Sequence, residues 1–298
     1  MPTTLITSKD DKGVHATRLF EIAYDQSKLD ADGAQRLNEQ GGEFQKGIKE
    51  LIKKLSTPNQ FADEETSSSY EYPKEYKGPR AIDDQIKAIA EIFDLDPAKA
   101  FQYSKNLPKL PEGAEGWFAV PSPKAIAKQQ FPDITDPVEQ YCLALQLVLK
   151  KLAASREFHN YREGQIDSAH LRMHIRTAQF MQMIAEMQND SDILIIAAQL
   201  GKRHRGRSSR RAREVFVMNE FGLGSVVVGS ILLVHPERLV RWEELDIDLP
   251  GDEFAPDADG GFSRAPSFGF GDDGAGFGAN EVSGVSDCFG SASGFLPQ

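Results

Sequence analysis

The sequence predicts an α+β protein, with an all-helical N-terminal region followed by a C-terminal domain of strands and helices. Three observations favour this class. Residues 79–190 carry helical periods with repeated cap-and-proline starts, a continuous isoleucine-rich run follows Asp192, and residues 262–298 alternate phenylalanines with small residues. A chain of 298 residues is long enough for two domains.

The first 78 residues are predicted to contain little fixed structure. Residues 1–30 are polar and weakly patterned, which is typical of a poorly ordered terminus. A helical period then passes through Phe44 and Ile48, and the pair Gly41-Gly42 should weaken its first half. The stretch STPNQFADEETSSSYEYPKEYKGP has no period, so residues 31–78 are interpreted as a helix and a polar linker.

Residues 79–190 are predicted to form a compact helical domain. The run AIDDQIKAIAEIF places Ile82, Ile86 and Ile89 on one face. Later helices begin with a cap residue and a proline, at Asp96-Pro97, Ser122-Pro123 and Asp136-Pro137. GAEGWFAVPS is a short turn or strand, and DSAHLRMHIRTAQFMQMIAEMQ is expected to be one long amphipathic helix.

Residues 191–298 are predicted to form a second domain. The short apolar run DILIIAAQL indicates a buried strand. SSRRAREVFVMNEF is predicted to be a helix capped by Ser208 or Ser209. LGSVVVGSILLVHP is predicted to be a second helix ended by Pro236, although its valines leave a strand open. Short strands with long connections should follow.

The charge is unevenly spread along the chain. The net charge of −11 argues against a general nucleic-acid binder, yet seven lysines and arginines lie within residues 202–213. Such a loop before a helix could bind phosphate, with Arg205, Arg207, Arg210 and Arg211 as contacts. The favoured interpretation is that these arginines pair with the acidic segment 251–298, which holds eight acids and one basic residue.

Neither a metal site nor catalytic chemistry is predicted. His170 and His174 have the four-residue spacing of two ligands on a helix, but no third ligand is evident, and two half-exposed helix histidines are the favoured interpretation. With two cysteines, Cys142 and Cys288, a disulfide framework or a four-cysteine zinc site is excluded. No hydrolase, kinase or dinucleotide motif is present, so we expect a protein that is not an enzyme and has no cofactor.

No stretch has the length and apolarity of a membrane span, and the N-terminus lacks the pattern of a secretory signal. We therefore expect a cytoplasmic protein, with export by another route left open.

The C-terminal part resembles a known family. The stretches AAQLGKRHRGRSSRRAREVF, NEFGLG, LLVHPERL, GDEF, FSRAPSFGF and GSASGFLPQ resemble the variable (target) proteins of diversity-generating retroelements, of the type found in small-genome candidate-phylum bacteria. In that family a reverse transcriptase copies a template repeat with errors at adenines, and the copy replaces the 3′ end of the target gene. The resemblance covers roughly residues 190–298 and, more weakly, KKLAASREFHNYREGQ. It implies a C-type-lectin-like domain over 191–298, with a variable region at about 260–289 before a fixed terminal motif.

The tail itself carries a strand pattern. In SFGFG, Phe268 and Phe270 alternate with small residues, which indicates a half-buried strand followed by a turn at DDG. Phe289 is either a further anchor or a surface aromatic, and the second is favoured. The expected scaffold residues, which should face inward, are Phe262, Phe268, Phe270, Phe277, Val282 and Val285.

The remaining residues of the tail are expected to form a variable recognition surface for an unknown protein or other macromolecule. They are Gly261, Ser263, Arg264, Ser267, Gly269, Gly271, Asp272, Gly276, Gly278, Asn280, Glu281, Ser283, Gly284, Ser286, Asp287, Cys288 and Phe289. A glycine-rich surface with no partner is the simpler alternative. The alternative function is a nucleic-acid-associated regulator that uses the basic cluster Lys202–Arg213.

Overall fold

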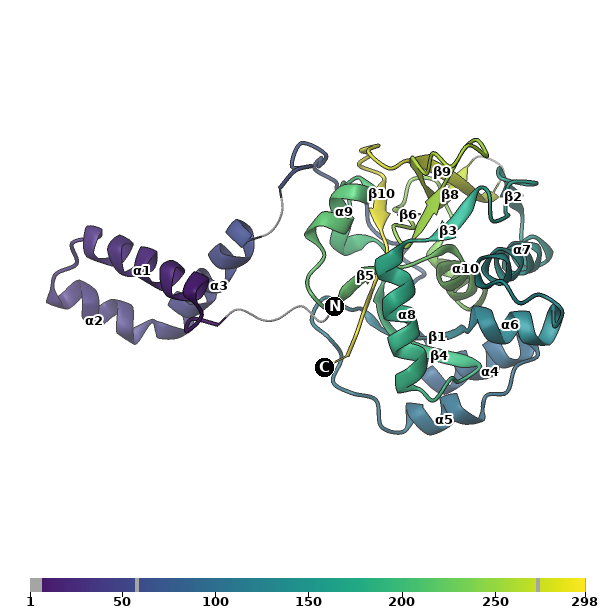
Figure 1. The fold of residues 1–298 in the computed structure, drawn as a ribbon, viewed down its shortest axis with the longest axis horizontal. Helices are drawn as coiled ribbons and strands as arrows, with labels where there is room; N and C mark the ends of the chain where they lie inside the picture. The colour runs from purple at the N-terminus through teal and green to yellow at the C-terminus, as the bar shows by residue number, and fades with distance from the viewer. Residues whose placement is uncertain (1–6, 57–58, 272–273, 298) are drawn as a thin grey trace. The chain divides into compact units, whose positions relative to one another are not determined.

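The computed structural model of the chain describes residues 7–56, 59–271 and 274–297 (Figure 1). They divide into two compact units, Met1–Thr57 and Pro58–Gln298. The chain is α+β, with helices at its N-terminal end and sheets toward its C-terminal end.

The first unit is helical throughout most of its described length. It contains α1 (Asp11–Gln26), α2 (Ala31–Glu39) and α3 (Gly41–Ser56). The expectation of a poorly ordered terminus is therefore wrong for α1. The single helix expected after residue 30 is instead two helices: α2 ends at Glu39, Gln40 is its C-cap, and α3 begins at Gly41. The side chain of Asp30 caps α2 by accepting the Gly33 amide at 2.7 Å.

The helices of the second unit begin largely where the cap signals place them. They are α4 (Ile82–Phe93), α5 (Ala98–Ser104), α6 (Pro123–Gln130), α7 (Pro137–Ser155), α8 (Ile175–Met187), α9 (Ser209–Val215) and α10 (Ser225–Val234), with short 3₁₀ turns η1 (Lys202–His204) and η2 (Pro236–Arg238). The side chains of Ser122, Asp136 and Ser208 each accept an amide of the first turn. Ser208 thus provides the cap of α9.

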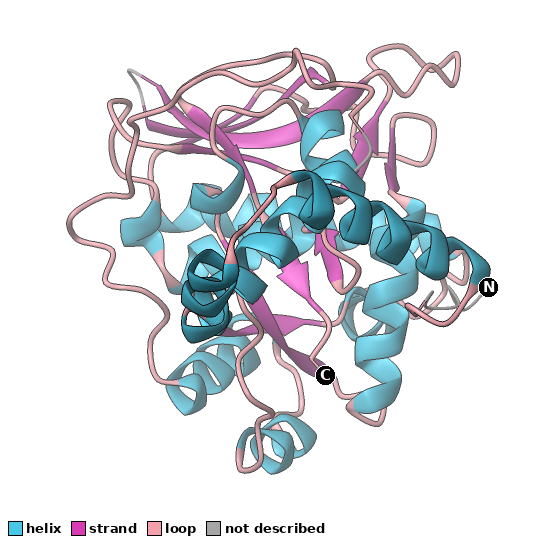
Figure 2. Cartoon of the chain, turned by 90° about the vertical axis from the view of Figure 1, so that its left-hand side faces the viewer, coloured by secondary structure: helices cyan, strands magenta, loops and turns pink. Residues whose placement is uncertain are grey.

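The strands form two sheets (Figure 2). Their bounds are β1 (Gly116–Pro121), β2 (Phe158–Asn160), β3 (Leu171–Met173), β4 (Ile193–Gln199), β5 (Glu220–Gly222), β6 (Asp246–Asp248), β7 (Asp252–Phe254), β8 (Arg264–Gly271), β9 (Gly274–Glu281), β10 (Phe289–Ser291) and β11 (Ser293–Phe295). One sheet has the order β1-β4-β11-β5, and the other has the order β10-β6-β8-β7-β3, with β9 beside β8 and β2 beside β9.

The boundary predicted at residue 190 does not divide the second unit. Strand β1 pairs antiparallel with β4 over six residues, and β2 and β3 join the second sheet. The regions 79–190 and 191–298 therefore share both sheets and one core. Strand pairing between distant segments leaves no local signal, which is why a break in local pattern was a poor guide to the domain boundary.

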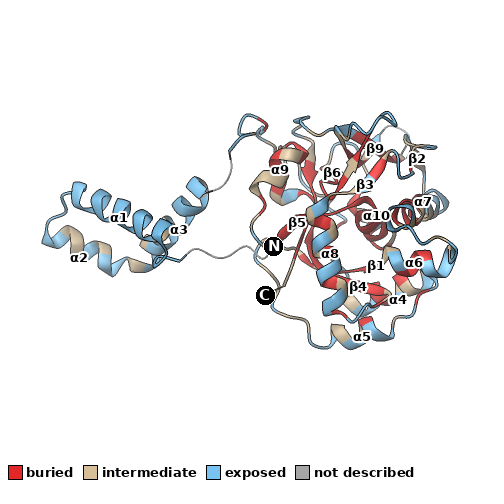
Figure 3. Ribbon diagram, in the orientation of Figure 1, coloured by how far each residue is buried: buried red, intermediate tan, exposed pale blue. Residues whose placement is uncertain are grey.

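Helix α10 lies at the centre of this unit. It contacts α7, β1 and β8, and every residue but Leu233 is buried. Gly229 permits the close approach, since a Cβ there would lie 2.6 Å from the side chain of Val148 and 3.2 Å from the ring of Phe268. Figure 3 shows the buried strands and α10 against the exposed outer helices. The core thus supports the β8–β9 hairpin from below.

Candidate recognition site

The β8–β9 hairpin is the frame on which the predicted recognition residues stand. It is antiparallel, with Phe268 opposite Phe277 and Ser267 opposite Gly278. Phe268 and Phe277 are fully buried, and their ring centroids are 5.2 Å apart. Such a pair adds about 0.5–1.5 kcal/mol beyond its area of burial. The inward aromatics therefore fix the register of the hairpin.

The predicted recognition residues differ widely in exposure. Those that are exposed are Gly261, Ser263, Gly271, Asn280, Glu281, Ser283, Gly284 and Asp287. Those of intermediate exposure are Arg264, Gly269, Gly278, Ser286, Cys288 and Phe289. We call the exposed set together with Gly278 the recognition face. The segments 261–264 and 280–284 are joined by the Val282 amide, which donates to the Ser263 carbonyl at 2.9 Å, and by the Arg264–Glu281 ion pair at 3.0 Å.

Two predicted recognition residues are buried, which corrects their assignment. Ser267 lies within the sheet between Asp248 of β6 and Gly278 of β9 and is 5% exposed. Gly276 pairs with β2, and a Cβ there would lie 2.8 Å from the ring of Tyr161. Asp272 lies outside the described residues.

The expected scaffold also needs correction. Val285 is 40% exposed because it lies in the irregular segment between β9 and β10. Phe262, Phe270 and Val282 are half-buried. The guanidinium of Arg172 covers the ring of Phe262 at 3.8 Å from its centroid, which explains how this aromatic is shielded outside a core.

The glycines of the tail separate into two kinds. At Gly271 a Cβ would meet no described atom within 4 Å, and at Gly278 it would make an ordinary 3.7 Å contact with Ser267. At Gly290, in contrast, it would lie 2.4 Å from the backbone oxygen of Gly201, and at Gly294 it would enter the ring of Phe221. The first kind can accept a side chain, whereas the second kind is required by close packing.

Gly269 is intermediate between these two kinds. A Cβ at Gly269 would lie 2.9 Å from a carboxylate oxygen of Asp246, so that side chain would have to move. At Gly261 and Gly284 the closest atoms would be 3.1 Å and 3.0 Å away. Substitution at these positions thus depends on small local shifts.

Two carboxylates on β6, which lies beside the hairpin in the same sheet, were not predicted. Asp246 and Asp248 alternate with Ile247 on β6, and Asp248 is opposite Ser267. Burial raises the pKa of each to about 7, and the Asn280 side chain donates to Asp248 at 3.3 Å. The alternation in LDIDLP could have revealed them, since Leu245, Ile247 and Leu249 point one way and the aspartates the other.

The four arginines predicted as anion contacts are paired with glutamates. The pairs are Arg205–Glu71, Arg207–Glu65 (3.3 Å), Arg210–Glu64 (Nε to Oε1, 2.8 Å) and Arg211–Glu65 (2.5 Å). These glutamates belong to residues 59–77, which we call the acidic strap. Charge pairing of these arginines was the favoured interpretation. The prediction that their partners are the acids of segment 251–298 is wrong. Their partner glutamates come instead from the segment that was expected to be a linker.

The acidic strap also reaches the recognition face. The Ser68 hydroxyl donates to the Asp287 carbonyl at 2.5 Å, and the Leu245 amide donates to the Glu71 carbonyl at 3.0 Å. The Thr66 amide donates to the Gly206 carbonyl at 2.7 Å. The acidic strap therefore contacts both the basic loop, which is the cluster Lys202–Arg213, and one end of the recognition face.

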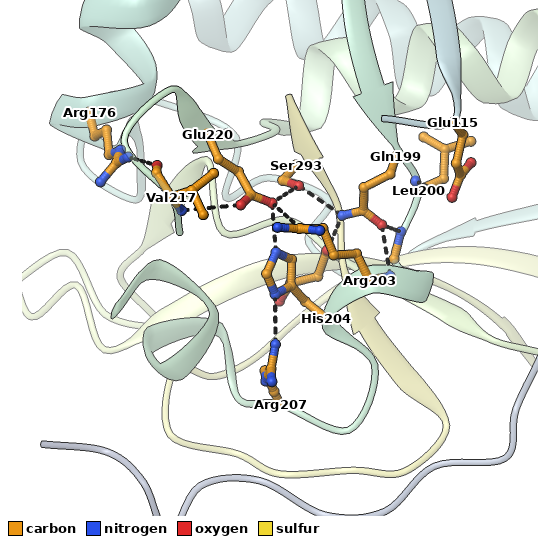
Figure 4. A network of polar contacts seen from close by, with 12 residues as sticks. Glu115, Arg176, Gln199, Leu200, Arg203, His204, Arg207, Val217, Glu220 and Ser293 are labelled. Atoms are coloured by element: carbon orange, nitrogen blue, oxygen red, sulfur yellow. Dashed lines mark hydrogen bonds and ion pairs between the residues drawn. The ribbon is translucent and has the colours of Figure 1, made fainter. Parts of the chain in front are cut away.

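A buried polar network ties the basic loop to the terminal strand (Figure 4). Glu220 accepts from His204 at 2.7 Å, from Ser293 at 2.7 Å and from Arg203 at 3.1 Å. Burial alone would raise the pKa of Glu220, but the contact with His204 and these other donors lower it to about 2. Burial lowers the pKa of His204, and Arg207 donates to its Nδ1. The Ser293 hydroxyl donates to the carboxylate rather than to the histidine.

The two predicted histidines do not share a helix. His170 precedes β3, and His174 follows it as the N-cap of α8, because the expected long helix begins only at Ile175. His170 is bonded to Asp167 at 2.8 Å. Among the described residues, no three His, Cys, Asp or Glu side chains gather to hold a metal ion.

A cavity of about 710 Å³ lies elsewhere, among α6, α7, α8 and β4. Its walls include Pro123, Met173 and Met181, and it is large enough for a small ligand. None of its lining residues belongs to the predicted sites.

Cys142 is buried in α7, where burial raises the pKa of its thiol to about 12. Cys288 is a half-buried free thiol beside Ser286. No helix in the described part of the chain has the length and apolarity needed to cross a membrane.

Comparison of the chain with protein-family models, with curated proteins and with solved structures finds no match.

Proposed function

We propose that this protein is a non-enzymatic ligand-binding protein that uses the recognition face to bind a protein or other macromolecule. The face is proposed to vary through adenine-directed mutagenesis by a diversity-generating retroelement. The observation that carries the proposal is the contrast among glycines: Gly271 and Gly278 have room for side chains, while Gly290 on β10 and Gly294 on β11 have none.

The frame beneath the face is suited to this use. Phe268 and Phe277 hold the hairpin register, while Asn280, Ser283 and Asp287 are exposed beside it. Substitution of exposed residues away from packed features usually changes stability by less than about 0.5 kcal/mol. Such a surface can change its side chains while its fold is kept.

The strand order supports a lectin-like assignment of residues 191–298. Strand β4 begins this region, and β11, near its end, returns to pair antiparallel with it, so that helices and short strands lie between the two. Residues 191–298 are not a self-contained domain, because both sheets also include strands from earlier residues, namely β1, β2 and β3. We therefore propose the likeness to a C-type lectin only for the order and pairing of the strands within residues 191–298.

The present variant offers few strong binding groups. Trp, Tyr and Arg dominate binding energy at most interfaces. On the recognition face the side chains are small or acidic except for the amide of Asn280, and Arg264 beside the face is paired with Glu281. We therefore expect this sequence to bind its ligand with low affinity. Variants with an aromatic residue at position 271 or 278 should bind their ligands with higher affinity.

Sequencing of sibling gene copies tests the proposal. We expect their differences to concentrate at the recognition face, with Phe268 and Phe277 unchanged, and a near-copy of this 3′ end, differing at adenines, to lie beside a reverse transcriptase gene. Buried Ser267 and Gly276 serve as an internal control, since the packing around them predicts less variation there. Differences spread evenly along the chain would contradict the proposal.

A further inference from the structure

The first unit carries apolar side chains that its own fold does not cover. No residue of its described part is buried, and most of α1 and α3 is coloured as exposed in Figure 3. The large apolar side chains that are most exposed are Val14, Leu19, Ile22, Leu51, Ile52 and Leu55. Uncovered apolar patches of this kind mark interaction surfaces.

On α3 these side chains form a stripe with coiled-coil spacing. Phe44, Ile48, Leu51 and Leu55 are separated by four, three and four residues, which is the a/d repeat of a helix-pairing seam. The first half of the stripe is partly covered, because the Phe44 ring lies 6.0 Å from the ring of Phe20 on α1. The second half is open, with Leu51 54% and Leu55 75% exposed.

Helix α1 presents a second apolar surface. At 3.6 residues per turn, Val14, Leu19 and Ile22 lie on the side of α1 opposite Phe20, which faces α3. The contact between α1 and α3 therefore leaves both helices with an uncovered face.

A unit of this size and packing needs a partner to be stable. Isolated helices of fewer than about 12–15 residues are marginal in water; α2 has 9 residues, and α1 and α3, with 16 each, exceed that limit only slightly. Very small domains usually depend on disulfides, metals or oligomerisation. Residues 7–56 contain no cysteine, and no metal-binding group is found among them. Oligomerisation is the remaining route.

The charge of the unit favours a second copy as the partner. Helix α3 holds four lysines and two glutamates, a net charge of +2. Residues 11–39 hold six acids and four basic residues, a net charge of −2. Two copies can therefore place α3 of one against α1 and α2 of the other with opposite charges adjacent, as a self-complementary interface requires.

We propose that residues 11–56 form a self-association module that joins two or more copies of this chain through the α1 and α3 apolar faces. The inference stands apart from the proposed function, because it concerns a different unit of the chain. Such an assembly would carry two or more copies of the second unit, Pro58–Gln298. Several weak binding sites could then bind a multivalent ligand at the same time, which raises the overall affinity.

Sedimentation velocity on the full chain over a range of concentrations tests the proposal, under reducing conditions to keep Cys288 from cross-linking copies. We expect a mass larger than one chain for the unaltered protein. The double variant Leu51→Glu/Leu55→Glu should weaken association at least about tenfold, because it places two charges in the seam. Both side chains are more than half exposed, so the second unit should keep its folded circular dichroism spectrum.

Lys46→Gln is the matched control. It lies on the side of α3 opposite the stripe and, like each Leu→Glu change, alters the charge by one, so association should persist. A single-chain mass at all concentrations would overturn the proposal, as it would mean that these faces pack within one chain. Association unaffected by the Leu51→Glu/Leu55→Glu variant would overturn it equally.

Discussion

At the scale of single residues, two carboxyl groups on β6, those of Asp246 and Asp248, have pKa values that burial raises. Asp248 is buried, with 4% of its surface exposed, and its carboxylate accepts one hydrogen bond, from the Asn280 side chain. A carboxyl in this position is more stable protonated than ionised, which accounts for its pKa of about 7. Asp246 beside it behaves in the same way.

The stability of the folded state should therefore respond to pH through Asp248. Its folded pKa of about 7 lies above its ordinary value of 3.8, so its contribution is complete at low pH and is lost as pH rises toward 7. The loss is roughly 1.4 kcal/mol per pH unit for one group. Denaturant unfolding at pH 5.5 and pH 7.5 should show a smaller decrease for Asp248→Asn than for the unaltered protein.

Comparing the two proteins is essential in that experiment. Burial lowers the pKa of His204, and that of His235 to about 4, so these groups favour the folded state as pH rises. Burial raises the pKa of Asp252 to about 6, which acts in the opposite direction. The difference between variant and parent isolates Asp248, and identical pH slopes would refute its role.

At the scale of elements, the sequence predicts what local patterns determine. Cap residues at Ser122, Asp136 and Ser208 start helices as expected, and β4 is the buried strand that its isoleucines indicate. Strands β2 and β3 were missed because each has three residues and gains its stability from strands β9 and β7, which lie far away in the sequence.

The acidic strap was missed for a related reason. Its composition is that of a linker, and its order comes from the arginines that it meets, such as Arg210 and Arg211. Likewise, alternation predicted the β8–β9 hairpin, but the covering of Gly276 by Tyr161 depends on the remote strand β2. Burial of a hairpin face by a distant segment cannot be read from the hairpin.

The strands β9 and β10 should differ in their tolerance of a methyl group. We expect Gly278→Ala to leave the free energy of unfolding within about 0.5 kcal/mol of the parent or to raise it, since a strand glycine costs conformational entropy. Gly290→Ala should lower it by roughly 1–3 kcal/mol, because the added Cβ meets the Gly201 backbone at 2.4 Å. Chemical denaturation of the matched pair measures both, and equal losses would argue against an open Gly278.

At the scale of the whole molecule, the distribution of charge bears on whether the chain can bind nucleic acid. A cluster of seven basic residues is the sequence feature that favours nucleic acid. In the folded chain the carboxylates of Glu64, Glu65 and Glu71 lie against that cluster. An overall charge of −11 adds long-range repulsion of a polyanion.

We therefore expect the protein to bind duplex DNA weakly, with a shallow dependence on salt. The variant Glu64→Gln/Glu65→Gln/Glu71→Gln removes the opposing charge and should bind more tightly, with a steeper salt dependence. Fluorescence anisotropy at two salt concentrations measures both proteins. Tight, steeply salt-dependent binding by the unaltered protein would favour the nucleic-acid-associated alternative.

The position of β11 has a consequence for how changes in the tail are tolerated. This strand is inserted between β4 and β5, inside a sheet whose other members are all translated before it. A frameshift or stop codon within residues 260–289 would remove it and leave the open edges of β4 and β5 without their partner. Under the proposed function, folding itself would act as a reading-frame filter: amino-acid changes on the recognition face would survive, while broken frames would yield chains that cannot close the sheet and would be degraded.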